Sequence, residues 1–186
     1  MTDRVLFGLL RLPKPLIRAI IAPVRMLLRL LPGFRHGMRS VDFERRIVAL
    51  ERESDLVAAG ALRKQALRSV PAPYCASLWR SEGWGRLRDG DPVGALAAFE
   101  KAIRLLDAGT VRAAMMYGAS RPHEVYLGAA YAALEAGENE AARGYYRRTV
   151  NFITEVLRLA PSPGQPARFM EDLEELRRRL GEPKRE

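Results

Sequence analysis

Apolar side chains recur at helical spacing from about residue 40 to the end of the chain. Phe43, Ile47 and Leu50 follow one another at intervals of four and three residues, with charged side chains between them. This spacing places apolar residues on one face of a helix, whereas a half-buried strand would show strict alternation. No convincing run of alternating residues is present, so the sequence predicts an all-α fold.

Prolines and glycines divide this pattern into separate helices. Residues 41–70 are expected to form either one bent helix or a helical hairpin, with the interruption at Gly60. Pro71-Ala72-Pro73 ends this segment, because proline lacks a backbone donor and clashes with the preceding helical turn. The sequence therefore predicts a helical unit that ends before residue 74.

Two further helices are predicted over residues 74–88 and 92–106, separated by a tight turn. Asp91 is a good N-cap for the second helix, and Pro92 suits its first position. A hairpin of this size cannot bury both of its faces alone. It needs a neighbouring unit, which is the physical basis of helical repeat proteins.

Small and aromatic residues in this hairpin follow the pattern A-x3-F-x2-A in the second helix. The matching residues are Ala95, Phe99 and Ala102, with Trp79 and Gly83 at the corresponding first-helix positions and Gly90 at the turn. Together they resemble a tetratricopeptide repeat. In that family, small residues let the two helices approach closely and aromatic residues fill the seam, so the resemblance implies a stack of helical hairpins.

A second unit follows the same spacing, with 47 residues between Phe99 and Tyr146 where the family has 34. Its residues are Tyr126, Ala130, Gly137, Ala142 and Tyr146, and an alternative register uses Gly128 and Tyr131. A last helix over residues 167–180 has acidic residues early and arginines late, which complements the helix dipole. It resembles the cap helix of repeat arrays. The resemblance covers residues 74–180, and the predicted repeat body is 74–186.

Most of the positive charge lies at the N-terminus. The net charge is +9, and residues 1–40 hold eight basic residues against Asp3. On a helical wheel the basic residues from Arg4 to Arg29 fall within about 80°, and the rest of the wheel is apolar. A helix lying flat on a membrane keeps its cations among lipid phosphates, whereas each arginine inside the bilayer costs at least ~2.5 kcal/mol. The predicted membrane-contacting residues are Arg4, Phe7, Arg11, Lys14, Arg18, Arg25 and Arg29.

This pattern predicts a basic amphipathic segment over residues 1–39, with residues 40–73 as the helical unit between it and the repeat body. The segment would attach the chain peripherally to the cytoplasmic side of an anionic membrane or to a membrane protein complex. Two alternatives stay open. The apolar face of the segment could pack on the chain's own body or on a partner helix, or the segment could be an arginine-rich targeting signal.

No residue pattern indicates an active site. Cys75 is the single cysteine, and neither His36 nor His123 belongs to a cluster with metal-ligand spacing. Gly83-Trp84-Gly85 lacks the glycine pattern and the following Lys-Ser/Thr of a phosphate-binding loop. We therefore expect no catalytic residue, no metal and no cofactor.

Binding is the function that the resemblance implies, because the first helices of such arrays line a concave groove. The corresponding residues here are Arg80, Trp84, Leu87 and Arg88 from the first unit, and Leu127, Tyr131 and Leu134 from the second. Two arginines beside a tryptophan suit a peptide with an acidic group and an apolar anchor. Alternatively, residues 41–70 could fill this groove themselves.

These features together predict a non-enzymatic adaptor that holds a protein partner, as a peptide or helix in the groove, at a membrane. The alternative is a structural subunit of a larger assembly, whose N-terminal helices pack on protein. Nucleic-acid binding is disfavoured, because the body is nearly neutral and the basic segment has only Phe7 and Phe34 for base stacking.

Overall fold

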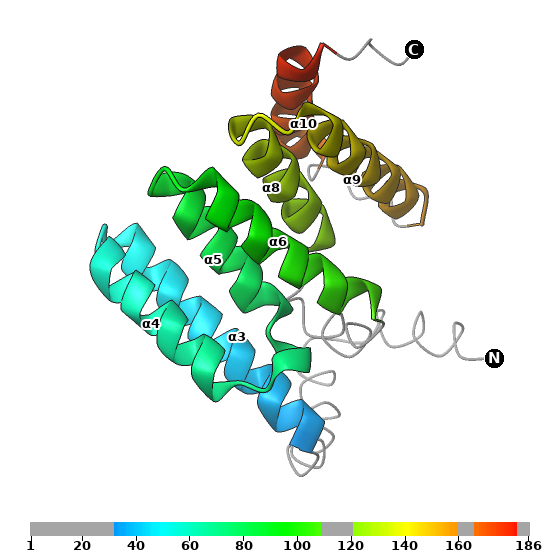
Figure 1. The fold of residues 1–186 in the computed structure, drawn as a ribbon. Coiled ribbons are helices and arrows are strands. Elements are labelled where there is room, and N and C mark those ends of the chain that lie inside the picture. The colour runs from blue at the N-terminus through cyan, green and yellow to red at the C-terminus, as the bar shows by residue number, and fades with distance from the viewer. Residues whose placement is uncertain (1–31, 109–120, 160–165, 182–186) are drawn as a thin grey trace, which may run out of the picture.

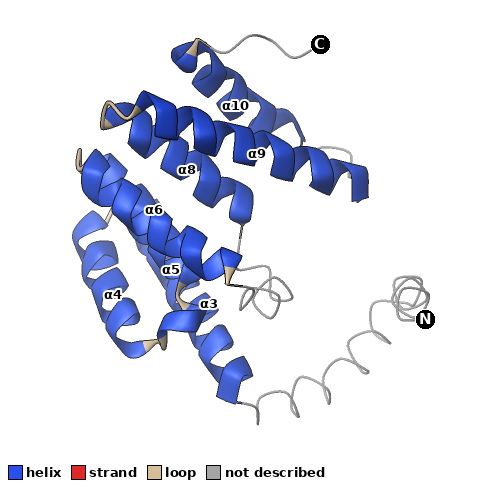
Figure 2. Ribbon diagram, turned by 45° about the vertical axis from the view of Figure 1, so that its right-hand side comes forward, coloured by secondary structure: helices blue, strands red, loops and turns tan. Residues whose placement is uncertain are grey.

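The computed structural model describes residues 32–108, 121–159 and 166–181, and these residues form helices without any strand (Figures 1 and 2). The all-α prediction is confirmed. The helices are α3 (Pro32–Arg52), α4 (Leu56–Ser69), α5 (Ala76–Arg88), α6 (Pro92–Asp107), α8 (Pro122–Glu135), α9 (Asn139–Leu159) and α10 (Pro166–Leu180), with a short 3-10 turn, η1, at Ala72–Tyr74.

Six of the helices pair into three hairpins, α3–α4, α5–α6 and α8–α9, which lie side by side in chain order (Figure 1). The helix α5 packs against α3 and α4, and α8 packs against α5 and α6. The helix α10 lies against α8 and α9, at the opposite end of the stack from α3 and α4. The first helices of the three hairpins are therefore neighbours in the order α3, α5, α8.

The three hairpin turns have the same backbone hydrogen bonds. The amides of Asp55, Asp91 and Glu138 each donate to the carbonyl five residues earlier, at 2.8–2.9 Å. The residue before each of them has a positive φ, and it is Ser54 in the first turn but Gly90 and Gly137 in the others. Such turns satisfy the last carbonyls of a helix and favour glycine at the left-handed position. The turn of the first hairpin therefore has the same geometry as the other two turns, a match that the sequence did not indicate because serine replaces glycine there.

The boundaries of the first hairpin differ from the prediction in two respects. Residues 41–70 do form a hairpin, but the break lies at residues 53–55, and Gly60 is inside α4. The side chain of Asp55 accepts a hydrogen bond from the Ala58 amide at 3.0 Å, so α4 begins at a capped position. The helix α3 begins at Pro32, and the expected boundary between residues 39 and 40 therefore falls within a continuous helix.

The core is built where small residues let neighbouring helices approach. Phe99 is fully buried, and its ring lies against the backbone of both Gly83 on α5 and Gly128 on α8. A Cβ atom added to Gly83 would lie 2.7 Å from the Phe99 ring, and one added to Gly128 would lie 2.3 Å from it. The alanines that define the two predicted repeat units are also fully buried: Ala95, Ala102, Ala130 and Ala142.

The predicted last helix is present as α10. Its buried side chains Leu173, Leu176 and Leu180 join the core formed by α6, α8 and α9. Its exposed side chains include Glu171, Glu175 and Arg178. This helix therefore covers the end of the stack with one apolar and one charged face.

Candidate binding cleft

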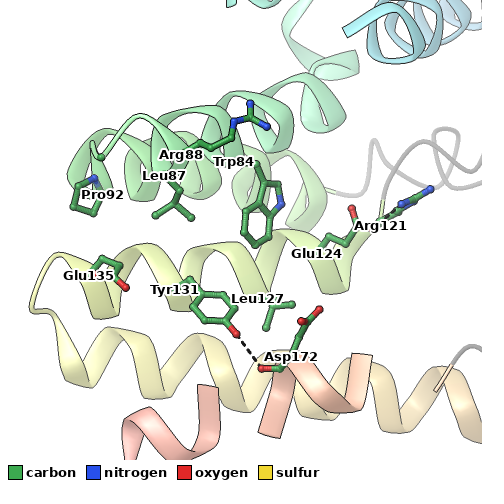
Figure 3. A pocket seen from close by; sticks show the side chains of 11 residues that line it. Trp84, Leu87, Arg88, Pro92, Arg121, Glu124, Leu127, Tyr131, Glu135 and Asp172 are labelled. Atoms are coloured by element: carbon green, nitrogen blue, oxygen red, sulfur yellow. Dashed lines mark hydrogen bonds and ion pairs between the residues drawn. The ribbon is translucent and has the colours of Figure 1, made fainter. Parts of the chain in front are cut away.

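A cleft of about 1010 Å³ lies between α5, α8 and α10 (Figure 3). Trp84 and Leu87 extend into it from α5, and Leu127 and Tyr131 line it from α8. The complete lining is Trp84, Leu87, Arg88, Gly90, Pro92, Arg121, Glu124, Leu127, Tyr131, Glu135 and Asp172. Its centre is thus apolar and aromatic, and its charged residues lie around that centre.

Ring contacts hold the aromatic side chains of the cleft in place. The Trp84 ring packs edge-on against Phe99, with the centroids 5.5 Å apart, and lies 6.5 Å from the Tyr131 ring. The Tyr131 hydroxyl donates a hydrogen bond to the backbone oxygen of Asp172 at 3.1 Å, which joins α8 to α10. Burial raises the pKa of Tyr131, and the nearby Asp172 carboxylate raises it further, so the hydroxyl keeps the proton that it donates.

Most of the charged residues that line the cleft are paired within the chain. Arg88 contacts Glu51 at 2.9 Å and Arg121 contacts Glu124 at 2.7 Å. Glu135 is held by Arg179 of α10 at 2.7 Å. The Asp172 carboxylate makes no ion pair with any residue in the described part of the chain.

The structure brings together five of the seven predicted groove residues. Trp84, Leu87, Arg88, Leu127 and Tyr131 all line the cleft. Leu134 does not line the cleft, although it packs against the same core as Trp84 and Tyr131. The lining residues that the sequence reading missed are of two kinds. Glu124 and Glu135 continue the spacing of Leu127 and Tyr131 along α8, so helical periodicity alone could have found them. Asp172 reaches the cleft from a helix distant in sequence, and no local pattern indicates this.

Arg80 does not face the cleft, and its predicted role as a groove residue is corrected. Only 6% of the residue is exposed, because α3 packs over it. Its guanidinium contacts Glu44 of α3 and Glu124 of α8, the latter at 2.9 Å. One cation therefore joins the first helices of all three hairpins, and it is not available to an acidic ligand.

Burial dominates the electrostatics of this ion pair. Desolvation raises the pKa of Glu44 above its ordinary value of 4.5, and the attraction of Arg80 offsets only part of that effect. A second buried cation, Arg63 of α4, contacts Glu51 at 2.7 Å and Glu82 at 3.4 Å. Gly85 gives Arg63 its space, since a Cβ atom at Gly85 would lie 2.5 Å from the guanidinium. Charged residues therefore hold the first hairpin against α5.

Residues 41–70 do not fill the cleft. None of the described residues of α3 and α4 lines it, although both helices pack against α5. The predicted membrane-contacting residues, from Arg4 to Arg29, lie outside the described residues. Among the helices that are described, none is both long and apolar enough to cross a bilayer.

The side chains considered for catalysis or metal binding, Cys75, His36 and His123, do not line this cleft. Cys75 is 2% exposed, its thiol donates to the Val70 carbonyl at 3.3 Å, and burial raises its pKa to about 11. Burial also lowers the pKa of His123, whose ring stacks on Phe152. His36 lies 5.5 Å from the ring of Tyr74. Among the described residues, no three histidine, cysteine, aspartate or glutamate side chains gather in a way that could hold a metal ion.

Comparison of the chain with protein-family models, with curated proteins and with solved structures finds no match. The resemblance to tetratricopeptide repeats consequently depends on the residues quoted above.

Proposed function

We propose that the chain is a non-enzymatic adaptor that binds a partner protein in the cleft between α5, α8 and α10. The observation that carries the proposal is the cleft itself, in which Trp84, Leu87, Leu127 and Tyr131 form an apolar centre surrounded by charged residues. Its volume is at the upper end for ligand sites, and buried tryptophan and tyrosine side chains are common anchors of protein interfaces. A helix or extended peptide with an apolar anchor fits this chemistry.

The repeat character of the body supports the same function. Three hairpins share one turn geometry, and Ala59, Ala95 and Ala142 are fully buried at the same position after each turn. The cleft is lined mainly by the first helices of the second and third hairpins, where tetratricopeptide-like arrays bind their peptides. We propose on this basis that the body is a tetratricopeptide-like array.

The proposed membrane attachment is carried by the sequence of the N-terminal segment. Its cationic stripe on an apolar surface is typical of helices that lie at an anionic membrane surface. Attachment to a surface raises the effective concentration of the adaptor for a partner on the same membrane, so a weak cleft contact is enough for recruitment. We propose peripheral attachment on the cytoplasmic side.

Co-sedimentation with vesicles tests the membrane part. The full chain is mixed with phosphatidylglycerol or phosphatidylcholine vesicles at low and high salt. A truncation at residue 40 is unsuitable, because it would cut α3. The test variant is Arg11→Glu/Arg18→Glu/Arg25→Glu, and the matched control reverses three exposed arginines of the body, Arg45, Arg46 and Arg68. We expect the parent and the control to sediment with anionic vesicles and the test variant to stay in solution.

Site-specific photocrosslinking tests the cleft. A photoreactive residue replaces Leu87 in the cleft or, as a control, the exposed Ala97 on α6. An adaptor gives a discrete crosslinked partner from position 87 and none from position 97. If no variant sediments with vesicles and the partner crosslinks equally from both positions, the chain is instead a structural subunit surrounded by protein.

A further inference from the structure

We infer that the cleft is also the docking site for the chain's own N-terminal segment, residues 1–31, so that membrane attachment of this segment opens the cleft to a partner. This inference rests on the proposed function and adds a regulatory step to the same site. Three observations carry it: the charge of the cleft, the composition of the segment and the position at which the segment joins the body.

The charges of the cleft favour a basic ligand, contrary to the acidic peptide expected from the sequence. Arg80 is buried between two carboxylates, and Arg88 and Arg121 are held by Glu51 and Glu124. An acidic ligand would have to share Arg88 and Arg121 with the carboxylates of Glu51 and Glu124 that already contact them. The charge left over is negative, because the Asp172 carboxylate lies at the cleft and no described residue pairs with it. The cleft therefore fits an apolar helix face with a cation at its border.

The first 31 residues have this composition. They contain six basic residues and one acidic residue, and most of the others are Leu, Ile, Val, Phe, Met or Ala. With helical spacing, the cations form one narrow stripe and leave a broad apolar surface beside it. This surface matches the apolar centre formed by Trp84, Leu87, Leu127 and Tyr131, and the adjacent stripe supplies cations for Asp172.

The segment is also attached where it can reach the cleft. It precedes Pro32, the first residue of α3, and α3 packs against α5, the helix that carries Trp84. Thirty-one residues span about 45 Å as a helix and roughly 100 Å when extended. Because the segment is joined directly to α3, its effective concentration at the cleft is ~mM, so even a weak docking contact is populated in solution.

Docking and membrane attachment exclude one another because they use the same apolar surface of the segment. A membrane that binds the segment shifts the population toward chains with an open cleft, as any ligand does when it binds only one of two states. An adaptor of this kind is closed in solution and becomes able to bind its partner at the membrane.

Fluorescence quenching on the full chain tests the inference. Trp79→Phe in every variant leaves Trp84 as the only tryptophan, and acrylamide, which is uncharged, reports its accessibility. We expect the Stern–Volmer constant of Trp84 to rise when phosphatidylglycerol vesicles are added and to stay constant with phosphatidylcholine vesicles. We expect the same rise without vesicles in Arg11→Glu/Arg18→Glu/Arg25→Glu, and no rise in Arg45→Glu/Arg46→Glu/Arg68→Glu.

A second pair of variants tests the cleft side of the contact. Asp172→Asn removes the carboxylate that pairs with no described residue and should raise the quenching of Trp84 in solution, whereas Glu171→Gln, an exposed neighbour outside the cleft, should not. Equal quenching in the parent and the N-terminal charge-reversal variant would overturn the inference and show a cleft that is open to a separate partner.

Sedimentation of the same samples separates the two proposals. If the N-terminal charge-reversal variant loses vesicle binding but its Trp84 is quenched as in the parent, the proposed membrane attachment stands and docking is overturned. A change in quenching in a chain that never binds vesicles supports docking, and it is then the proposed membrane attachment that fails.

Discussion

The ring of Phe99 on α6 lies directly against the backbone of Gly128 on α8. A Cβ atom at position 128 would approach the ring to 2.3 Å, and Phe99 is fully buried, with the backbone of Gly83 also against its ring. The absence of one side chain therefore sets how closely the second and third hairpins approach each other.

We predict that Gly128→Ala destabilises the fold by about 1–3 kcal/mol, because the added methyl group overpacks this contact. Urea denaturation followed by circular dichroism measures the change. Gly144→Ala in α9 is the matched control, since nothing lies within 4 Å of a Cβ atom there and the residue is exposed. The control should be stabilised by up to about 1 kcal/mol, from helix propensity alone. Equal stability of the two variants would contradict the packing argument.

Replacing Arg80, the cation that joins the first helices of the three hairpins, should lower the stability of the fold much more than replacing an exposed arginine. Arg80→Gln leaves the carboxylates of Glu44 and Glu124 close to each other without their shared partner. We expect a loss of about 3–5 kcal/mol in the free energy of unfolding. Arg45→Gln, an exposed arginine of α3, should change it by less than about 0.5 kcal/mol. A loss as small as that of the control would show that Arg80 is dispensable.

The pKa of Glu44 predicts a pH effect of definite sign. Because this pKa is higher in the folded chain than its ordinary value of 4.5, ionisation of Glu44 opposes folding. Its contribution to stability is fully present below pH 4.5 and is lost as the pH rises through the folded-state pKa. The difference in unfolding free energy between the parent and Glu44→Gln should therefore shift in favour of Glu44→Gln as the pH rises. A shift in the opposite direction would mean that Arg80 dominates over burial.

The single cysteine should be almost unreactive in the folded chain. With a pKa of about 11 and 2% exposure, Cys75 is rarely a thiolate near pH 8. We expect its modification by a disulfide reagent to be slower than in the unfolded chain by more than ~100-fold. Fast modification under native conditions would show an accessible thiol and reopen the question of a chemical role.

The first hairpin turn offers a stabilising substitution. Ser54 has φ 62° at the position that Gly90 and Gly137 occupy in the other two turns. Ser54→Gly should raise the thermal midpoint and stabilise the chain by about 1 kcal/mol, since a side chain in this conformation is strained. Gly90→Ala should have the opposite effect, and a shift of the same sign for both variants would contradict the proposed equivalence of the turns.

Features of the fold that depend on neighbouring residues were predictable from the sequence. Asp91 does cap α6, where it accepts a hydrogen bond from the Gly94 amide at 2.8 Å, and Gly90 has the positive φ that a turn glycine permits. The turn of the first hairpin was harder to predict, because it has Ser54 where glycine is expected. The break was predicted at Gly60 instead, although a glycine inside a helix lowers the stability of the helix by only about 1 kcal/mol.

Features that depend on contacts distant in sequence were not predictable. The sequence shows Arg80 at a groove position, but only the packing of α3 on α5 determines that it is buried between Glu44 and Glu124. In the same way, Asp172 reaches the cleft because α10 folds back onto α8. The apolar centre of the cleft and the positions of Glu124 and Glu135 were predictable from helix periodicity, whereas the ion pairs of the cleft and the contribution of Asp172 were not.

The position of α10 makes the cleft a property of the end of the stack. Trp84 and Tyr131 belong to two hairpins with the same turn geometry, whereas the wall that carries Asp172 is formed by α10, which packs on α8 and α9. Lengthening the protein before α3 would leave this wall in place. A hairpin inserted between α9 and α10 would carry Asp172 away from Trp84, and the charged residues left around the apolar centre would be Arg88, Arg121, Glu124 and Glu135. Hairpins added before α3 would therefore leave the charge of this cleft unchanged, whereas a hairpin added before α10 would remove the Asp172 carboxylate from it.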